Sequence, residues 1–134
     1  MPGKGTAPSE GAKLEDMVTE IAEAMGLRVR RQVKAGSRLW GNKRRIDILL
    51  EHPFSGKVLG IECKVQHTRG TAEEKLPAAV QDIASWPIPG ILVIHGAGFS
   101  DRMVGFLLST GRVVQLPDLQ DWLRLYFGVR DTEQ

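Results

Sequence analysis

Two acidic residues and a lysine lie inside apolar stretches, where charged side chains are costly without a partner. Glu62 and Lys64 stand two positions apart in the run 58–65, and Asp47 lies in the run 46–50. Side chains two apart on a strand point to the same side, so Glu62 and Lys64 would share one face. If the two runs are neighbouring strands, the Asp47 carboxylate comes close to that of Glu62.

Close carboxylates repel each other, and the pKa of one rises unless a cation lies between them. Mg²⁺ prefers oxygen ligands and keeps several waters, so two carboxylates and a substrate phosphate suit it. Such a metal lowers the pKa of bound water and neutralises charge on a phosphate ester. Lys64, with a free pKa of about 10.4, would stay protonated, which favours transition-state stabilisation over general-base catalysis. Positioning the attacking water is the other role open to it.

These three residues also have an ordinary structural interpretation. Acid-x-Lys triplets occur by chance, and Glu62 and Lys64 could form a surface pair of little energetic consequence, with Asp47 as a strand-end charge. The combination of Asp47 one strand earlier, a basic segment before it and an acidic helix ahead favours the metal site.

The rest of the chain predicts elements that could position these groups. Apolar residues spaced three and four apart predict a helix over 14–25 that stops at Gly26. Residues 27–33 alternate as a half-buried strand would, and the runs 46–50 and 58–65 predict an antiparallel hairpin around the turn 52–57. The segment 34–45 is expected to be a mobile basic loop.

Further along, the apolar pattern predicts a helix that ends near Trp86. Its start is ambiguous, because Thr71 with Glu74 fits a capping box whereas Pro77 prefers the first helical turn. A strand, a helix, a strand and a final helix follow at 90–94, 101–108, 112–116 and 119–127. This order predicts an α/β fold with one mixed sheet covered by helices on both faces.

Composition sets the broad class. With 134 residues, 42% apolar and 25% charged, the chain fits a single domain, expected over residues 13–130 after a disordered tail over 1–12. The lone Cys63 excludes an intramolecular disulfide, and no Cys/His cluster indicates zinc. Without a signal-peptide pattern or a run of membrane-spanning length, an intracellular, cytoplasmic protein with no membrane partner is expected.

Positive charge is concentrated in one segment. Eight Lys and Arg and no acidic residue lie between Arg28 and Ile46, although the net charge is only +2. Such a segment can bind a phosphate backbone, and a solvated, solubilising loop is the alternative. Trp40, within it, could stack on a base. The candidates for DNA contacts are Arg30, Arg31, Lys34, Arg38, Lys43, Arg44 and Arg45.

Asp47, followed fifteen positions later by Glu62-Cys63-Lys64 on the next strand, resembles the PD-(D/E)XK nuclease superfamily over residues 14–94. Ile46 stands where the motif's name has Pro, a loosely kept position. The resemblance implies a restriction-endonuclease-like core and a Mg²⁺-dependent DNA endonuclease, with Mn²⁺ able to substitute. Asp47, Glu62 and the backbone carbonyl of Cys63 would hold the metal.

The helix before Gly26 is similar to the start of Holliday-junction resolvases, which implies that Glu15 joins the metal site and that a homodimer cuts branched DNA. Helix geometry independently places Glu15 beside Val18 on the flank of the apolar stripe. A first-turn acid that stabilises the helix dipole is the alternative. Gln66 continues the phase of Glu62 and could orient a water or the DNA backbone, or have no role.

A DNA endonuclease acting on junctions is therefore the leading hypothesis. A restriction or repair endonuclease is the nearest alternative, since the motif serves all of these reactions. A non-catalytic DNA-binding module that retains the fold is an alternative from another class, and an enzyme acting on another phosphate ester is a weaker one.

Overall fold

The computed structural model describes residues 9–37, 43–65, 76–96 and 99–130. Its elements are α1 (Glu10–Ala24), β1 (Arg28–Ser37), β2 (Lys43–Glu51), β3 (Val58–Val65), α2 (Leu76–Ala84), β4 (Gly90–His95), α3 (Asp101–Ser109), β5 (Val113–Gln115), the 3₁₀ turn η2 (Leu116–Asp118) and α4 (Leu119–Phe127). The predicted order of helices and strands is confirmed.

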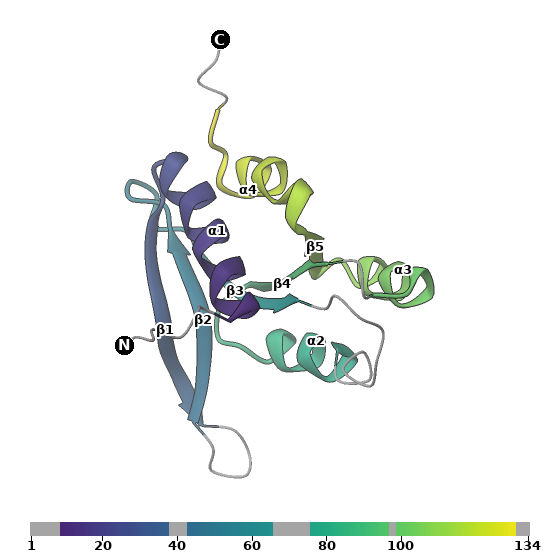
Figure 1. Cartoon of the computed structure of the whole chain (residues 1–134). Helices are drawn as coiled ribbons and strands as arrows, with labels where there is room; N and C mark the ends of the chain where they lie inside the picture. Colours follow the sequence, from purple (N-terminus) through teal and green to yellow (C-terminus); the bar gives the residue numbers. More distant parts are fainter. Residues whose placement is uncertain (1–8, 38–42, 66–75, 97–98, 131–134) are drawn as a thin grey trace, which may run out of the picture.

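The five strands form one mixed sheet in the order β1-β2-β3-β4-β5 (Figure 1). β1, β2 and β3 are antiparallel neighbours, whereas β3, β4 and β5 run parallel. Each parallel connection passes through a helix, as crossovers between parallel strands require. The predicted α/β class with a mixed sheet is confirmed.

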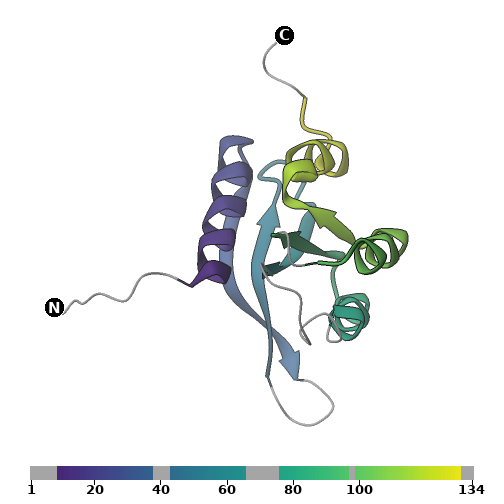
Figure 2. The same ribbon diagram turned by 45° about the vertical axis from the view of Figure 1, so that its right-hand side comes forward.

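Helices cover both faces of the sheet, with α1 on one side and α2 and α3 on the other (Figure 2). The α1-side core joins α1 and α4 to the sheet through Leu14, Val18, Ala22, Leu27, Ile48, Leu50, Leu59, Ile61, Cys63, Ile91, Val93, Val114, Leu119, Leu123 and Phe127. The α2-side core comprises Ile46, Leu76, Val80, Ile83, Trp86, Leu92, Ile94, Phe99 and Val113.

Helix α2 approaches the sheet closely because two glycines make room for Trp86. A Cβ atom on Gly60 would lie 2.7 Å from the Trp86 ring, and one on Gly90 would lie 2.4 Å from it. Both distances are shorter than van der Waals contact, so the indole packs directly on the backbones of β3 and β4. This contact sets the height of α2 over the sheet.

Two predicted boundaries were wrong: the start of the first helix and the extent of the basic loop. Helix α1 begins at Glu10, because the Ser9 hydroxyl accepts the Ala12 N–H and caps the helix. Residues 10–12 are therefore helical rather than part of a tail, and residues 1–8 lie outside the described part of the chain. The loop predicted over 34–45 is also too long, because the β1–β2 ladder continues past Lys34 opposite Arg45.

The described part of α2 runs from Leu76 and includes Pro77, which suits a first helical turn because its missing N–H has no intrahelical partner there. Residues 66–75 before it lie outside the described part of the chain, so the choice between the two predicted starts stays open. Thr71 and Glu74 lie outside the described residues. The strand predicted over 112–116 is shorter, since the chain turns into η2 with Pro117 near its start.

Within the described ranges, no helix has both the length and the apolar character needed to cross a membrane.

Candidate active site

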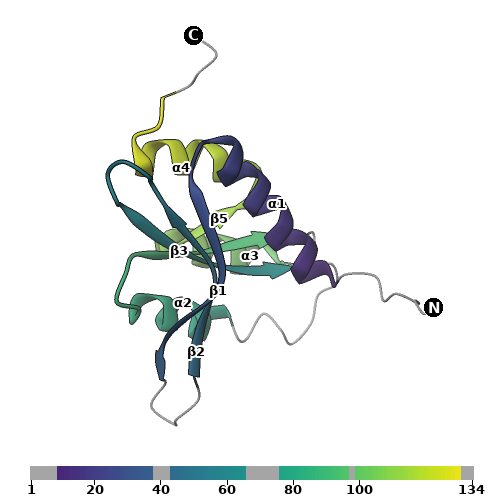
Figure 3. The same cartoon turned by 90° about the vertical axis from the view of Figure 1, so that its left-hand side faces the viewer.

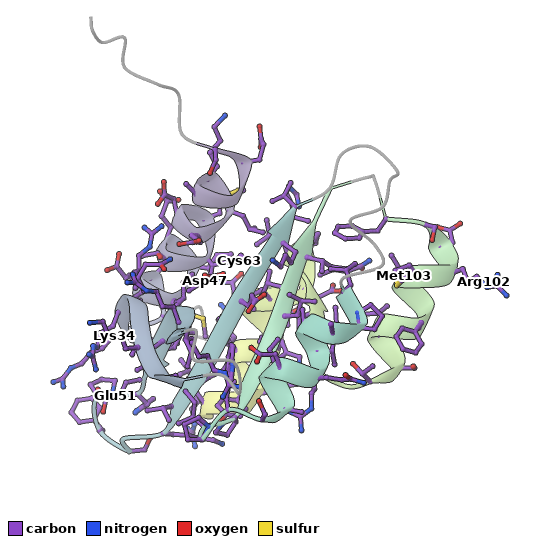
Figure 4. All side chains as sticks on the ribbon, turned by 90° about the horizontal axis from the view of Figure 1, so that it is seen from below. Lys34, Asp47, Glu51, Cys63, Arg102 and Met103 are labelled. Carbon is purple, nitrogen blue, oxygen red and sulfur yellow. The ribbon has the colours of Figure 1, made fainter. Side chains whose placement is uncertain are left out.

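Asp47 lies where the β2–β3 pairing reaches the motif. The paired register runs from Glu51 opposite Val58 to Ile48 opposite Ile61, so Asp47 and Glu62 come next on their strands. Asp47 Oδ2 accepts a hydrogen bond from the Cys63 N–H at 3.1 Å. The carboxylate therefore points across to β3, and Asp47 and Cys63 lie beside each other near α1 (Figure 4).

This sideways orientation follows from a rotation of β2. Residues two apart on a regular strand share a face, yet Ile48 belongs to the α1-side core and Ile46 to the α2-side core. The strand must turn over between them, at Asp47. A side chain at the turning point lies close to the plane of the sheet, which is why Asp47 reaches a backbone N–H of the neighbouring strand.

β1 rotates at the same level. Gln32 has a φ of 54°, a left-handed conformation that costs a non-glycine residue about 1–3 kcal/mol. The flanking pairs Arg31 with Ile48 and Val33 with Ile46 place Gln32 level with Asp47. The two-stranded ribbon of β1 and β2 thus turns over as a unit beside the motif.

Glu62 and Lys64 share a face, as the sequence predicted. Lys64 Nζ lies 3.5 Å from Glu62 Oε2, and the exposed fractions of the side chains are 48% for Lys64 and 16% for Glu62. Their partners on β4 are Leu92 and Ile94, both in the α2-side core. The carboxylate is thus largely covered, whereas the ammonium group reaches solvent.

Burial raises the pKa of Glu62 above its ordinary value, and the adjacent Lys64 ammonium opposes that rise. The negative charges of Asp47 and Asp82 raise this pKa further. A covered carboxylate with two acidic neighbours is stabilised in its charged form by a nearby cation.

The oxygen atoms at the motif suit a small divalent metal ion that takes only some of its ligands from the protein. Within residues 9–37, 43–65, 76–96 and 99–130, no three Asp, Glu, His or Cys side chains are grouped closely enough to hold a metal ion. Asp47, Glu62 and the Cys63 carbonyl would supply three oxygens, and waters or a phosphate would complete the shell. Mg²⁺ accepts this composition because it retains several waters.

Glu15 lies on the same side of the sheet as Cys63. Burial raises the pKa of the Cys63 thiol, and the charges of Asp47, Glu15 and Glu62 raise it further, so all three carboxylates are near this residue. Glu15 is 17% exposed, pointing inward as predicted, and its Oε1 accepts from Arg31 Nη2 at 3.1 Å and Gln32 Nε2 at 3.5 Å. Its role as a metal ligand stays a prediction.

The predicted DNA-binding residues fall into two groups. Arg31 bonds to Glu15 and to Asp16, and Arg44 pairs with Asp82 at 3.2 Å. The Arg44 side chain is only 16% exposed, and its buried Nε has no hydrogen-bond partner among the residues that the structure describes. Arg44 is therefore largely covered by the fold, whereas Arg31 is paired with acids of α1 but stays partly exposed.

Arg30, Lys34 and Arg45, by contrast, are exposed, and Lys34 lies directly opposite Arg45 on the two strands. Arg38, Trp40 and Gln66 lie outside the described residues. Of Lys43 only the backbone, at the start of β2, is described.

Asp82 on α2 was missed by sequence reasoning. Its Oδ2 accepts the Trp86 Nε1–H at 3.3 Å, it pairs with Arg44, and its charge acts on Glu62. The available signal was its spacing of four from Trp86, which would bring the two side chains together if the helix reached Trp86. In the structure α2 ends at Ala84, and Trp86 follows it in a turn. Its ion pair with Arg44 on β2 and the electrostatic effect of Asp82 on Glu62 of β3 join residues far apart in the chain, which no local spacing indicates.

Comparisons with known proteins agree with this geometry. A family model described as a PD-(D/E)XK nuclease superfamily domain matches residues 6–122. No curated protein matches the sequence.

Two solved structures share the fold. The crystal structure of AF1548, a protein of unknown function, is similar with a TM-score of 0.53 and 18% identity, over 76% of this chain and 55% of that one. The protein VC1899 from Vibrio cholerae is similar with a TM-score of 0.50 and 14% identity, over 87% of this chain and 32% of that one. This chain thus spans about half of the first protein and about a third of the second.

Proposed function

Because this chain belongs to the PD-(D/E)XK nuclease superfamily, we propose that it is a Mg²⁺-dependent DNA endonuclease with Asp47, Glu62 and Lys64 at its active site. The observation that carries the proposal is the Asp47 carboxylate, held by the Cys63 N–H at 3.1 Å on the strand that also bears Glu62.

Asp47, Glu62 and the Cys63 carbonyl would hold the metal, with Glu15 as a further ligand and Mn²⁺ as a substitute. When bound, the metal supplies Lewis-acid stabilisation of the phosphate and a bound water of lowered pKa. The hydrogen bond from Cys63 fixes the Asp47 carboxylate and leaves it acceptor capacity for a cation, since each oxygen has two lone pairs.

Lys64 is suited to act on the phosphate. Its side chain is 48% exposed and its Nζ lies 3.5 Å from Glu62 Oε2, so the ammonium group could donate to a non-bridging oxygen of a phosphate bound at this site. A cation placed where negative charge develops stabilises the transition state. Gln66, the next residue in this phase, is proposed to orient the attacking water.

The DNA backbone is proposed to lie along the ribbon of β1 and β2, which extends beyond the other strands (Figure 3). Lys34 and Arg45 are exposed and directly opposite each other on that ribbon. Like charges in such a pair repel, and a phosphate between them relieves the repulsion. Arg30, Arg38 and Lys43 are proposed to extend this contact.

Branched DNA is the proposed substrate, cut by a homodimer. The proposal rests on the similarity of the helix before Gly26 to that of junction resolvases, and on the need for two active sites to cut two strands symmetrically. The junction and a linear duplex of matched sequence therefore make the informative pair of substrates.

The test is cleavage of a four-way junction, a linear duplex and a single strand in Mg²⁺ or Mn²⁺ by the wild-type protein and by Asp47→Asn and Glu62→Gln. Each substitution is expected to reduce the cleavage rate by about 100-fold or more, because it removes charge from the metal site. Asp121→Asn, on the exposed face of α4, is the matched control and should cut normally.

Paired nicks confined to the junction would support resolution, whereas equal cutting of the linear duplex would assign a restriction or repair activity. Unchanged cleavage by Asp47→Asn would refute the proposed mechanism. Salt-sensitive DNA binding without any cleavage would indicate a binding module instead.

A further inference from the structure

A pocket of about 530 Å³ lies at the carboxyl ends of β4 and β5, beside the start of α3. Ile94, Phe99 and Val104 contribute apolar walls, and His95, Asp101 and Gln115 contribute polar groups. Ligand sites in α/β proteins commonly lie at the carboxyl ends of parallel strands, and this volume is in the usual range for them.

The pocket belongs to the same face of the sheet as Glu62 and Lys64. Lys64 pairs with Ile94, and Ile94 pairs with Gln115, so these residues form one row across β3, β4 and β5. Partners on parallel strands point to the same side. Lys64 and Gln115 stand two strand spacings apart, roughly 10 Å, with the pocket wall Ile94 between them.

We propose that this pocket accepts one unstacked nucleobase of the DNA strand that is cut, an inference that rests on the proposed nuclease function. The separation from Lys64 equals about three stacked nucleotides at about 3.4 Å each, and fewer where the strand is unstacked. The base therefore comes from within about three nucleotides of the scissile phosphate. Branch points favour this, because extruding a base that is already unpaired costs least.

The lining chemistry selects a base rather than a phosphate. Phe99, Val104 and Ile94 offer apolar surface to a planar ring, whereas the Asp101 carboxylate repels a phosphate. A carboxylate accepts from the amino group of cytosine, and a glutamine pairs with the amino group and N7 of adenine. Thymine has no amino group and presents carbonyl oxygens instead, so the acceptor-only Asp101 carboxylate disfavours it, whereas the Gln115 amide can donate to those oxygens.

The experiment uses the full chain with the Asp47→Asn substitution, so that a four-way junction stays intact while bound. The junction carries 2-aminopurine, in turn, at each of the three positions on either side of the cleavage site mapped with the wild-type protein. Saturating protein is expected to raise the fluorescence severalfold at one position, where the base leaves the stack, and to change it little at the others.

Two further variants test whether the base enters this pocket. Val104→Phe fills it, and Gln115→Ala removes a partner at the far end of the row. Each is expected to remove most of the fluorescence rise. Gln120→Ala, an exposed glutamine on α4, is the matched control for Gln115→Ala and should leave the rise unchanged. Because Val104→Phe can disturb α3, its circular dichroism and melting temperature are measured alongside.

Base identity is the second readout. The wild-type protein is expected to cut a junction about tenfold more slowly when thymine, rather than adenine or cytosine, stands at the position whose fluorescence rose. Asp101→Asn is expected to weaken this discrimination, because an amide can donate to the thymine carbonyl oxygens, and a merely structural role of Asp101 would not produce this change.

The two proposals fail differently. A wild-type protein that cuts the junction without any fluorescence rise, or with a rise that Val104→Phe and Gln115→Ala both leave unchanged, overturns the pocket assignment and retains the nuclease. A protein that neither binds nor cuts any of the DNA substrates overturns both.

Discussion

At the scale of single residues, the site combines two carboxylates in different surroundings. Asp47 is oriented by a hydrogen bond from the Cys63 backbone N–H. Glu62 is covered, and its pKa is raised by burial and by its acidic neighbours. The charge of Glu62 therefore depends on the arrival of a cation.

A raised pKa means that folded Glu62 holds its proton to higher pH than unfolded Glu62 does. Its contribution to stability is thus present below the unfolded pKa, about 4.3, and is lost as the pH rises through the folded value. We expect metal-free Glu62→Gln to melt above the wild-type protein at pH 7–8, and this difference to shrink as the pH falls toward 4. Calorimetry in EDTA measures it.

Added Mg²⁺ is expected to raise the wild-type melting temperature and to leave that of Glu62→Gln unchanged, because the substitution removes a ligand. A metal-free variant less stable than the wild-type protein at neutral pH would contradict the account of Glu62.

At the scale of elements, helix α2 controls the surroundings of Glu62. Trp86 rests on Gly60 and Gly90, and one turn earlier Asp82 accepts the indole N–H while it pairs with Arg44 of β2. Helix α2 and Trp86, which follows its last residue Ala84, thus contact β2, β3 and β4 beside the motif. The height of α2 over the sheet sets how closely Asp82 approaches Glu62.

Gly90→Ala is expected to lower the free energy of unfolding by about 1–3 kcal/mol, because the new methyl group would lie 2.4 Å from the Trp86 ring and push α2 outward. Gly105→Ala in α3 is the matched control. A Cβ there meets no atom within 4 Å, so this change should be neutral or stabilise the helix by about 0.5–1 kcal/mol. Urea denaturation compares the two, and equal effects would refute the close packing of Trp86.

At the scale of the whole molecule, strand alternation places the adjacent Arg44 and Arg45 on opposite faces, and the rotation of the β1–β2 ribbon decides which of the two faces α2. Arg44 faces α2 and pairs with Asp82, whereas Arg45, one residue later, lies opposite Lys34 and is exposed. The basic segment is therefore part structural and part available to DNA.

Lys34→Ala and Arg45→Ala are each expected to reduce the salt dependence of DNA binding by about one unit of slope and to leave stability almost unchanged. Arg44→Met should show the reverse, a loss of about 1–3 kcal/mol of stability with an unchanged slope, since it leaves Asp82 without its arginine. Binding titrations across salt concentrations, with denaturation alongside, decide this. A lower slope for Arg44→Met alone would invert the assignment.

The sequence by itself determined the kinds and order of the elements and the shared face of Glu62 and Lys64. These features depend on periodicity within a few residues, which local backbone geometry translates directly into helix stripes and strand faces. The family resemblance rested on the same local motif, and the match to residues 6–122 confirms it.

Only the tertiary structure decided how the site is assembled. The sideways orientation of Asp47 follows from a rotation shared with Gln32, and the pairing of Glu15 with Arg31 and the contact of Asp82 with Arg44 join separate elements. Each depends on where strands and helices meet after packing, at sequence separations that no local pattern encodes. Nothing in the sequence distinguishes the exposed Arg45 from the paired Arg44. The packing of the β1–β2 ribbon against α2 makes the difference.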